Sequence, residues 1–81
     1  MDTAVKITAE NIEARRTIQR ILENNDVDPA SFIFGINEIK IPSDKTEAVL
    51  IELRLFGGKI VKDISAIEAE VGAGRQVHIT F

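Results

Sequence analysis

Aliphatic residues recur along this chain at two different spacings, and the order of those spacings restricts the possible folds. In residues 3–8, 47–56 and 76–81 they occupy alternate positions, which is typical of a β-strand with one buried face. In residues 11–25 and 59–71 they recur every third or fourth position, which indicates amphipathic helices. The pattern therefore predicts an α+β domain in which strands and helices share one core.

Each predicted element supplies a set of side chains to that core. From the strands these are Val5, Ile7, Val49, Ile51, Leu53, Leu55, Val77, Ile79 and Phe81. From the helices they are Ala14, Ile18, Ile21, Leu22, Ile60, Ile64, Ile67 and Val71. Asn11 suits the N-cap of the first helix, Asn24 and Asn25 suit a left-handed stop, and Gly72 suits the C′ position of the second helix.

A further strand is predicted over residues 31–41, although its apolar residues change parity. The first set is Phe32, Phe34 and Ile36, and the second is Ile39 and Ile41. A β-bulge within residues 35–38 would bring both sets to one face. Residues 42–45 then form the turn into the strand at 47–56, which has the strongest strand pattern in the chain.

The predicted order is β-α-β-β-α-β, which is the split βαβ or ferredoxin-like arrangement. Two interlocked right-handed crossovers would give a four-stranded antiparallel sheet with both helices on one face. Eighty-one residues suffice for one domain, so we expect residues 1–81 to form a single ferredoxin-like unit.

Composition excludes several function classes. A net charge of −3 and a pI near 5.0 argue against nucleic-acid binding, which needs a positive field. No apolar run approaches the ~20 residues of a membrane span, so we expect no membrane insertion. The chain has no cysteine and no signal-peptide pattern at its start, and we expect a cytoplasmic location.

The sheet face opposite the helices would be open, and it is the predicted interaction surface. That surface consists of Lys6, Ala48, Leu50, Glu52, Arg54, Phe56 and His78. Leu50 and Phe56 would make an exposed apolar patch, which indicates self-association or a protein partner. The charged side chains would form cross-strand ion pairs around it.

The sequence offers no catalytic constellation, no metal-ligand cluster and no cofactor motif. His78 is the only histidine, and it lies at an outward-facing position. A possible anion site is Gly57, Gly58 and Lys59, because they would precede a helix N-terminus whose N–H groups are free. The alternative is that the two glycines serve only as a strand–helix turn.

The layout resembles an ACT-type regulatory domain. The similar segments are residues 21–27, which end the first helix, and residues 64–72, which lead into the last strand. The chain is similar also to the ACT-like C-terminal domain of MgtC/SapB-type proteins. The resemblance implies regulation and dimerisation. Amino-acid-binding ACT domains have a Gly- or Pro-containing turn after the first strand, and Thr8 to Asn11 contain neither residue.

We therefore expect a non-catalytic regulatory or protein-interaction module that forms homo-oligomers through its open sheet face or a sheet edge. A second hypothesis is a sensor domain for an amino acid, nucleotide or ion. A third is an engineered ferredoxin-like scaffold without a selected activity.

Overall fold

Four strands and three helices are present in the computed structural model, which describes residues 2–63 and 75–81. The strands are β1 (Asp2–Thr8), β2 (Glu38–Pro42), β3 (Lys59–Asp63) and β4 (Arg75–Thr80). The helices are α1 (Ile12–Asn24), α2 (Ala30–Ile33) and α3 (Ser43–Leu55). A four-stranded sheet with two long helices confirms the predicted α+β class.

The strands lie in the order β2-β1-β4-β3. The central strands β1 and β4 run parallel, and each edge strand runs antiparallel to its neighbour. The sheet is therefore mixed, and the predicted antiparallel sheet with β-α-β-β-α-β order is wrong. Instead, α3 connects β2 at one edge to β3 at the other, and a β3–β4 pair follows.

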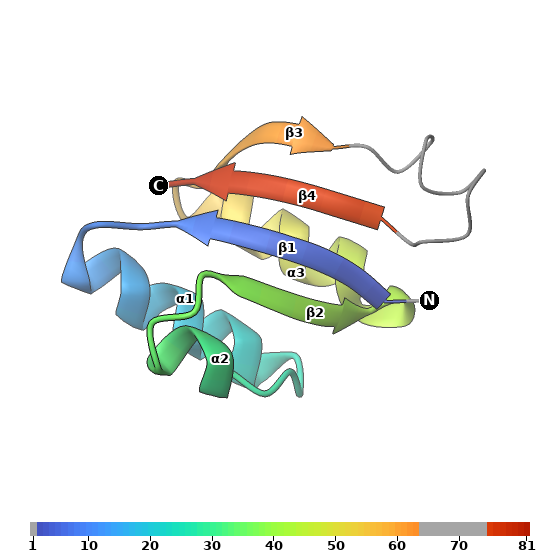
Figure 1. Ribbon diagram of the computed structural model, residues 1–81, viewed down its shortest axis with the longest axis horizontal. Coiled ribbons are helices and arrows are strands. Elements are labelled where there is room, and N and C mark those ends of the chain that lie inside the picture. The colour runs from blue at the N-terminus through green and yellow to red at the C-terminus, as the bar shows by residue number, and fades with distance from the viewer. Residues whose placement is uncertain (1, 64–74) are drawn as a thin grey trace.

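The two long helices cover one face of this sheet (Figure 1). Alternate strand residues point to the helices and are buried, among them Val5, Ile7 and Ile79. The helices add Ile18, Leu22, Val49 and Leu53 to the same core. On the other face of the sheet, toward the viewer in Figure 1, no helix of the described residues lies over the strands.

The first helix forms where the sequence predicts it. The Asn11 side chain accepts a hydrogen bond from the Glu13 N–H at 2.7 Å, which confirms the N-cap. The left-handed residue at the other end is Asp26, with φ of 58°, rather than the expected Asn24 or Asn25. The Val27 N–H then donates to the Leu22 carbonyl at 2.9 Å, which closes the helix end in a Schellman motif.

The segment with the strongest strand pattern is a helix, α3, so the predicted strand at 47–56 and turn at 42–45 are wrong. The apolar residues of this segment fit both the two-residue repeat of a strand and the 3.6-residue repeat of a helix. Its buried residues are Thr46, Val49, Leu50 and Leu53, which have helical spacing. Alanine, leucine, glutamate and arginine predominate in it, and they favour a helix over a strand.

The two glycines after α3 end this helix. Gly57 has φ of 104° and occupies the C′ position. The Gly58 N–H donates to the Leu53 carbonyl at 2.8 Å, and the Gly57 N–H donates to the Arg54 carbonyl. Together these two bonds complete a second Schellman motif. A Cβ on Gly58 would lie 2.8 Å from the Leu53 carbonyl oxygen and 2.9 Å from atoms of Ile79 and Phe81, so a glycine fits best there.

Residues 31–41 form two elements in place of the predicted bulged strand. The short helix α2 places Phe32 in the core, and Gly35, with φ of 85°, reverses the chain before β2. The parity change at residues 35–38 therefore marks the end of a helix. Phe34, which was expected beside Phe32, is exposed to solvent.

The first five residues of the predicted helix at 59–71 form a strand in the structure, so this part of the prediction is wrong. Residues Lys59–Asp63 form β3, which pairs antiparallel with β4. The adjacent β-branched Ile60 and Val61 favour this extended conformation. Residues 64–71 of the predicted helix, and its expected C′ glycine at Gly72, lie outside the described residues.

Candidate functional site: the open face of the sheet

The structure divides the predicted interaction surface between two places. Lys6 in β1 and His78 in β4 lie directly opposite each other on the open face. The other predicted residues, Ala48, Leu50, Glu52, Arg54 and Phe56, belong to α3 and its C-cap on the helix side. Their assignment to the open face is therefore wrong, because it depended on a strand at 47–56.

The predicted apolar patch does not exist. Leu50 is 3% exposed and packs in the core. Phe56 is exposed at the end of α3, and Glu52 accepts a hydrogen bond from the Asn25 amide at 3.2 Å. The helix N-terminus expected after Gly57, Gly58 and Lys59 is also wrong, since the two glycines follow the C-terminus of α3 and Lys59 begins β3; the dipole at a helix C-terminus disfavours anions.

A row of charged and polar side chains crosses the open face instead. Lys6 is the register partner of Glu38 in β2 and of His78 in β4. His78 is in turn the partner of Lys62 in β3. Residues directly opposite each other in a sheet share a face, so these four side chains form a line across all four strands. At ~4.8 Å per strand, this row spans roughly 14 Å.

Two more lysines extend this row into a basic surface. Lys40 is opposite Ala4, and Lys59 is opposite Thr80, both on the open side. Four of the five lysines in the chain therefore lie on this face, which we call the lysine face: Lys6, Lys40, Lys59 and Lys62.

The lysine face has the opposite charge to the whole chain. Its acidic residues among the described part of the chain are Asp2 and Glu38, which leave two of the four lysine charges in excess. The whole chain has a net charge of −3. This face thus carries a local excess of positive charge, with four of the ten Lys and Arg side chains of the chain, and it attracts anions at short range.

A shallow hollow of about 200 Å³ lies in the middle of this face. Its floor includes Ala4, whose small side chain leaves space between longer neighbours. The hollow is lined by Ala4, Lys6, Glu38, Lys62, Gln76, Val77 and His78. Any ligand held there would meet two lysines, one carboxylate, an imidazole and an amide.

His78 is held in place by a contact with Thr8 of the adjacent strand β1. Its Nε2 atom lies 3.1 Å from the Thr8 hydroxyl. Either group can be the donor, depending on the imidazole tautomer. This contact fixes the ring over the sheet, between Lys6 and Lys62, where it can donate to or accept from a bound group.

Several other kinds of site are missing from the described residues. The open face there has no Phe, Tyr or Trp on which a nucleic-acid base could stack. Residues 2–63 and 75–81 contain no cluster of three His, Cys, Asp or Glu side chains suited to a metal ion. Within the same ranges, no helix has the length and apolar character needed to cross a bilayer.

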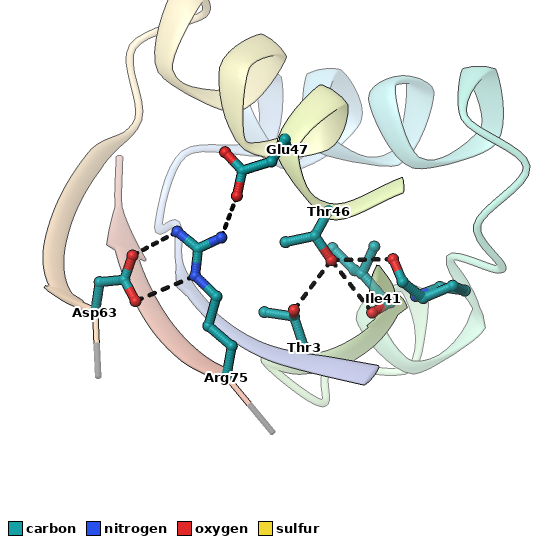
Figure 2. A network of polar contacts seen from close by, with 7 residues as sticks. Thr3, Ile41, Thr46, Glu47, Asp63 and Arg75 are labelled. Atoms are coloured by element: carbon teal, nitrogen blue, oxygen red, sulfur yellow. Dashed lines mark hydrogen bonds and ion pairs between the residues drawn. The ribbon is translucent and has the colours of Figure 1, made fainter. Parts of the chain in front are cut away.

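Two polar clusters on the helix side have structural roles, and sequence reasoning did not find them (Figure 2). Arg75 in β4 forms paired hydrogen bonds with Asp63 in β3, at 2.5 and 3.2 Å, and an ion pair with Glu47 in α3. Hydrogen bonding to Asp63, with a smaller contribution from Glu47, raises the pKa of Arg75 above its usual value. The guanidinium therefore stays charged and joins three elements.

The second cluster surrounds the buried Thr46 hydroxyl. It lies 3.0 Å from both the Thr3 hydroxyl and the Pro42 carbonyl oxygen. A carbonyl can only accept, so the single Thr46 hydrogen goes to Pro42 and the Thr3 hydroxyl donates to Thr46. Both buried threonines are thereby satisfied, and the start of α3 is tied to β1 (Figure 2).

Comparisons with protein-family models, with curated proteins and with solved structures gave no match. The ACT-type resemblance stays a prediction, and one of the two segments on which it rests, residues 64–72, lies outside the described residues. The function is therefore inferred from the geometry and charge of the lysine face.

Proposed function

We propose that this protein is a non-catalytic binding module whose lysine face holds an acidic segment of a protein partner. The observation that supports this most is the gathering of four of the five lysines on one open face of a chain whose net charge is negative. Such a surface steers an acidic partner into contact and orients it.

The shape of the face favours an extended segment. The four lysines lie on β1, β2 and β3, so together they reach from one edge of the sheet to the other. Small-molecule sites are usually deeper hollows of ~300–1,000 Å³ with apolar walls. An acidic polypeptide laid across the strands could contact several lysines together, and Thr8, Gln76 and His78 could bond its polar groups.

The same charges argue against one form of self-association. Two copies placed with their lysine faces together would oppose like charges over the whole contact, which costs free energy. The apolar patch on which face-to-face association was predicted is absent, because Leu50 is buried. An open-face dimer is therefore no part of this proposal.

Charge reversal on the lysine face should weaken binding of an acidic peptide. We expect the Lys6→Glu, Lys62→Glu double variant to bind a fluorescein-labelled oligoglutamate roughly tenfold or more weakly, since each reversed charge turns attraction into repulsion. Fluorescence anisotropy at about 20 mM and about 150 mM salt would measure this, and wild-type affinity should fall with salt.

Lys45→Glu is the control for the Lys62→Glu single variant, which has the same net charge, because Lys45 lies on α3, away from the lysine face. Added acidic charge suits the first turns of a helix, so this variant should fold. It should retain nearly all binding. Equal affinity of the face and control variants, or equal wild-type binding of oligoglutamine, would refute the proposal.

A second candidate is a small anionic ligand in the hollow over Ala4. The convergence of Lys6, Lys62, Gln76 and His78 on that hollow favours it. We expect any thermal stabilisation by inorganic phosphate, glutamate or AMP to disappear in Ala4→Leu, which fills the hollow, while oligoglutamate binding persists. If none of these compounds raises the wild-type melting temperature, the small-ligand candidate fails and the acidic-segment proposal is unaffected.

A further inference from the structure

The two edges of the sheet differ in how open they are to pairing with another strand. The β3 edge has a bulge between Ile60 and Lys62, and bulges are a common means of blocking edge-to-edge association. The β2 edge has none of this irregularity, since its five residues pair in unbroken register with β1. The β2 edge is therefore the better surface for adding a strand.

The direction of the backbone groups in β2 is known from its pairing with β1. The Asn37 carbonyl, just before β2, accepts from the Ile7 N–H at 2.7 Å. Antiparallel strands alternate residues that bond to the neighbour with residues whose groups point away. Odd-numbered residues thus bond to β1, and the N–H and C=O groups of Glu38 and Lys40 point outward from the sheet.

There is space beside these outward groups. A hollow of about 560 Å³ lies where β2 meets the connection between α1 and α2, and it is lined by Asp28, Ile36, Glu38, Ile39 and Lys40. Two exposed apolar side chains, Phe34 and Ile36, precede the strand. A row of free amide groups beside exposed apolar side chains is a ready template for strand addition.

We propose that two copies of this chain pair antiparallel through β2, centred on Ile39, to form a continuous eight-stranded sheet. In this register Glu38 is opposite Lys40 of the partner subunit, and Lys40 is opposite the partner subunit's Glu38. Both pairs exchange N–H···O=C bonds, and both place opposite charges side by side on the open face. The two-fold axis makes each contact occur twice.

Neighbouring registers that keep the outward groups aligned are less favourable. Centring the pair on Lys40 would oppose two lysines and would place Pro42, which has no N–H, where a donor is needed opposite Glu38. Centring it on Glu38 would oppose two carboxylates. Charge and hydrogen bonding therefore both select the register centred on Ile39.

The dimer would double the proposed binding surface. A two-fold axis perpendicular to the sheet keeps both open faces on the same side, so the two lysine faces would form one surface. The inference does not depend on what that surface binds, because it rests on the edge of β2.

Charge exchange at the edge tests this register. We expect wild-type protein to show a concentration-dependent monomer–dimer equilibrium in sedimentation velocity between micromolar and millimolar concentrations. Glu38→Lys and Lys40→Glu should each raise the dimer dissociation constant roughly ten- to thirtyfold, because both ion pairs become like-charge pairs. An equimolar mixture of the two variants should form a heterodimer, since every pair is then complementary.

A wild-type chain that stays monomeric at millimolar concentration would overturn the proposal. So would a dimer of Lys40→Glu as tight as that of wild type. This variant also guards against a folding artefact, since the partner of Lys40 in β1 is the uncharged Ala4. Far-UV circular dichroism should show both single variants folded. If Glu38→Lys unfolds because of the adjacent Lys6, the Lys40→Glu result alone decides.

Discussion

Leu50→Glu should unfold most of the protein. Leu50 is 3% exposed and belongs to the core, so the change removes an apolar side chain and buries a carboxylate. The expected loss of stability is about 3–5 kcal/mol, which is comparable to the whole stability of a small domain. Far-UV circular dichroism of the variant and the wild type without denaturant would measure the unfolded fraction.

Ile51→Glu is the matched control, one residue further along α3. Its side chain is 55% exposed, so the substitution should change stability by no more than about 0.5 kcal/mol. The pair also separates the two possible conformations of this segment. A strand at 47–56 would bury Ile51 and expose Leu50, so a tolerated Leu50→Glu beside a disruptive Ile51→Glu would contradict the helix.

Phe32→Ala should be the most damaging truncation in the connection between α1 and β2. Phe32 is 1% exposed and is the largest fully buried side chain in the described part of the core. Its ring also contacts the Arg15 guanidinium, whose carbon lies 4.1 Å from the ring centre. The cavity and the lost contact should together cost about 3–5 kcal/mol, measurable as a lower urea midpoint.

Phe34→Ala controls for the loss of an aromatic ring from the same segment. Phe34 is 82% exposed, and its truncation should alter stability by less than about 0.5 kcal/mol. A bulged strand at 31–41 would place both rings on one face and make the two variants similarly disruptive. Similar losses for the two variants would therefore count against α2.

The elements that could be predicted from the sequence have only one consistent pattern. The alternation of Val5 and Ile7, and of Val77 and Ile79, fits a half-buried strand and does not fit a helix. In α1 the helical spacing of the apolar residues and the capping residue Asn11 indicate the same helix. In these segments local propensity and hydrophobic spacing indicate the same structure, and the structure confirms them.

The elements that could not be predicted have two overlapping patterns. Val49 and Leu53 belong both to an alternating set with Ile51 and Leu55 and to a helical set with Thr46 and Leu50. Only packing against the sheet decides between them. Helix propensity would have favoured the helical set, because most residues of α3 are good helix formers.

The candidate site was predictable to the same extent as its strands. Lys6 and His78 follow from the parity of β1 and β4, both of which were identified correctly. Lys40 could also have been found, since it alternates with Ile39 and Ile41. Lys59 and Lys62 could not, because their segment was assigned to a helix and their alignment with His78 depends on a bulge.

The central position of β4 affects how the chain can fold as it is made. β1 is synthesised first, but its parallel neighbour in the middle of the sheet is β4, some seventy residues later. Until residue 80 has left the ribosome, β1 has only β2 as a partner, and β3 has no neighbour in the sheet. The core therefore cannot close during synthesis of the preceding residues. This late, long-range pairing should make folding slower than in a domain of equal size with mainly local contacts.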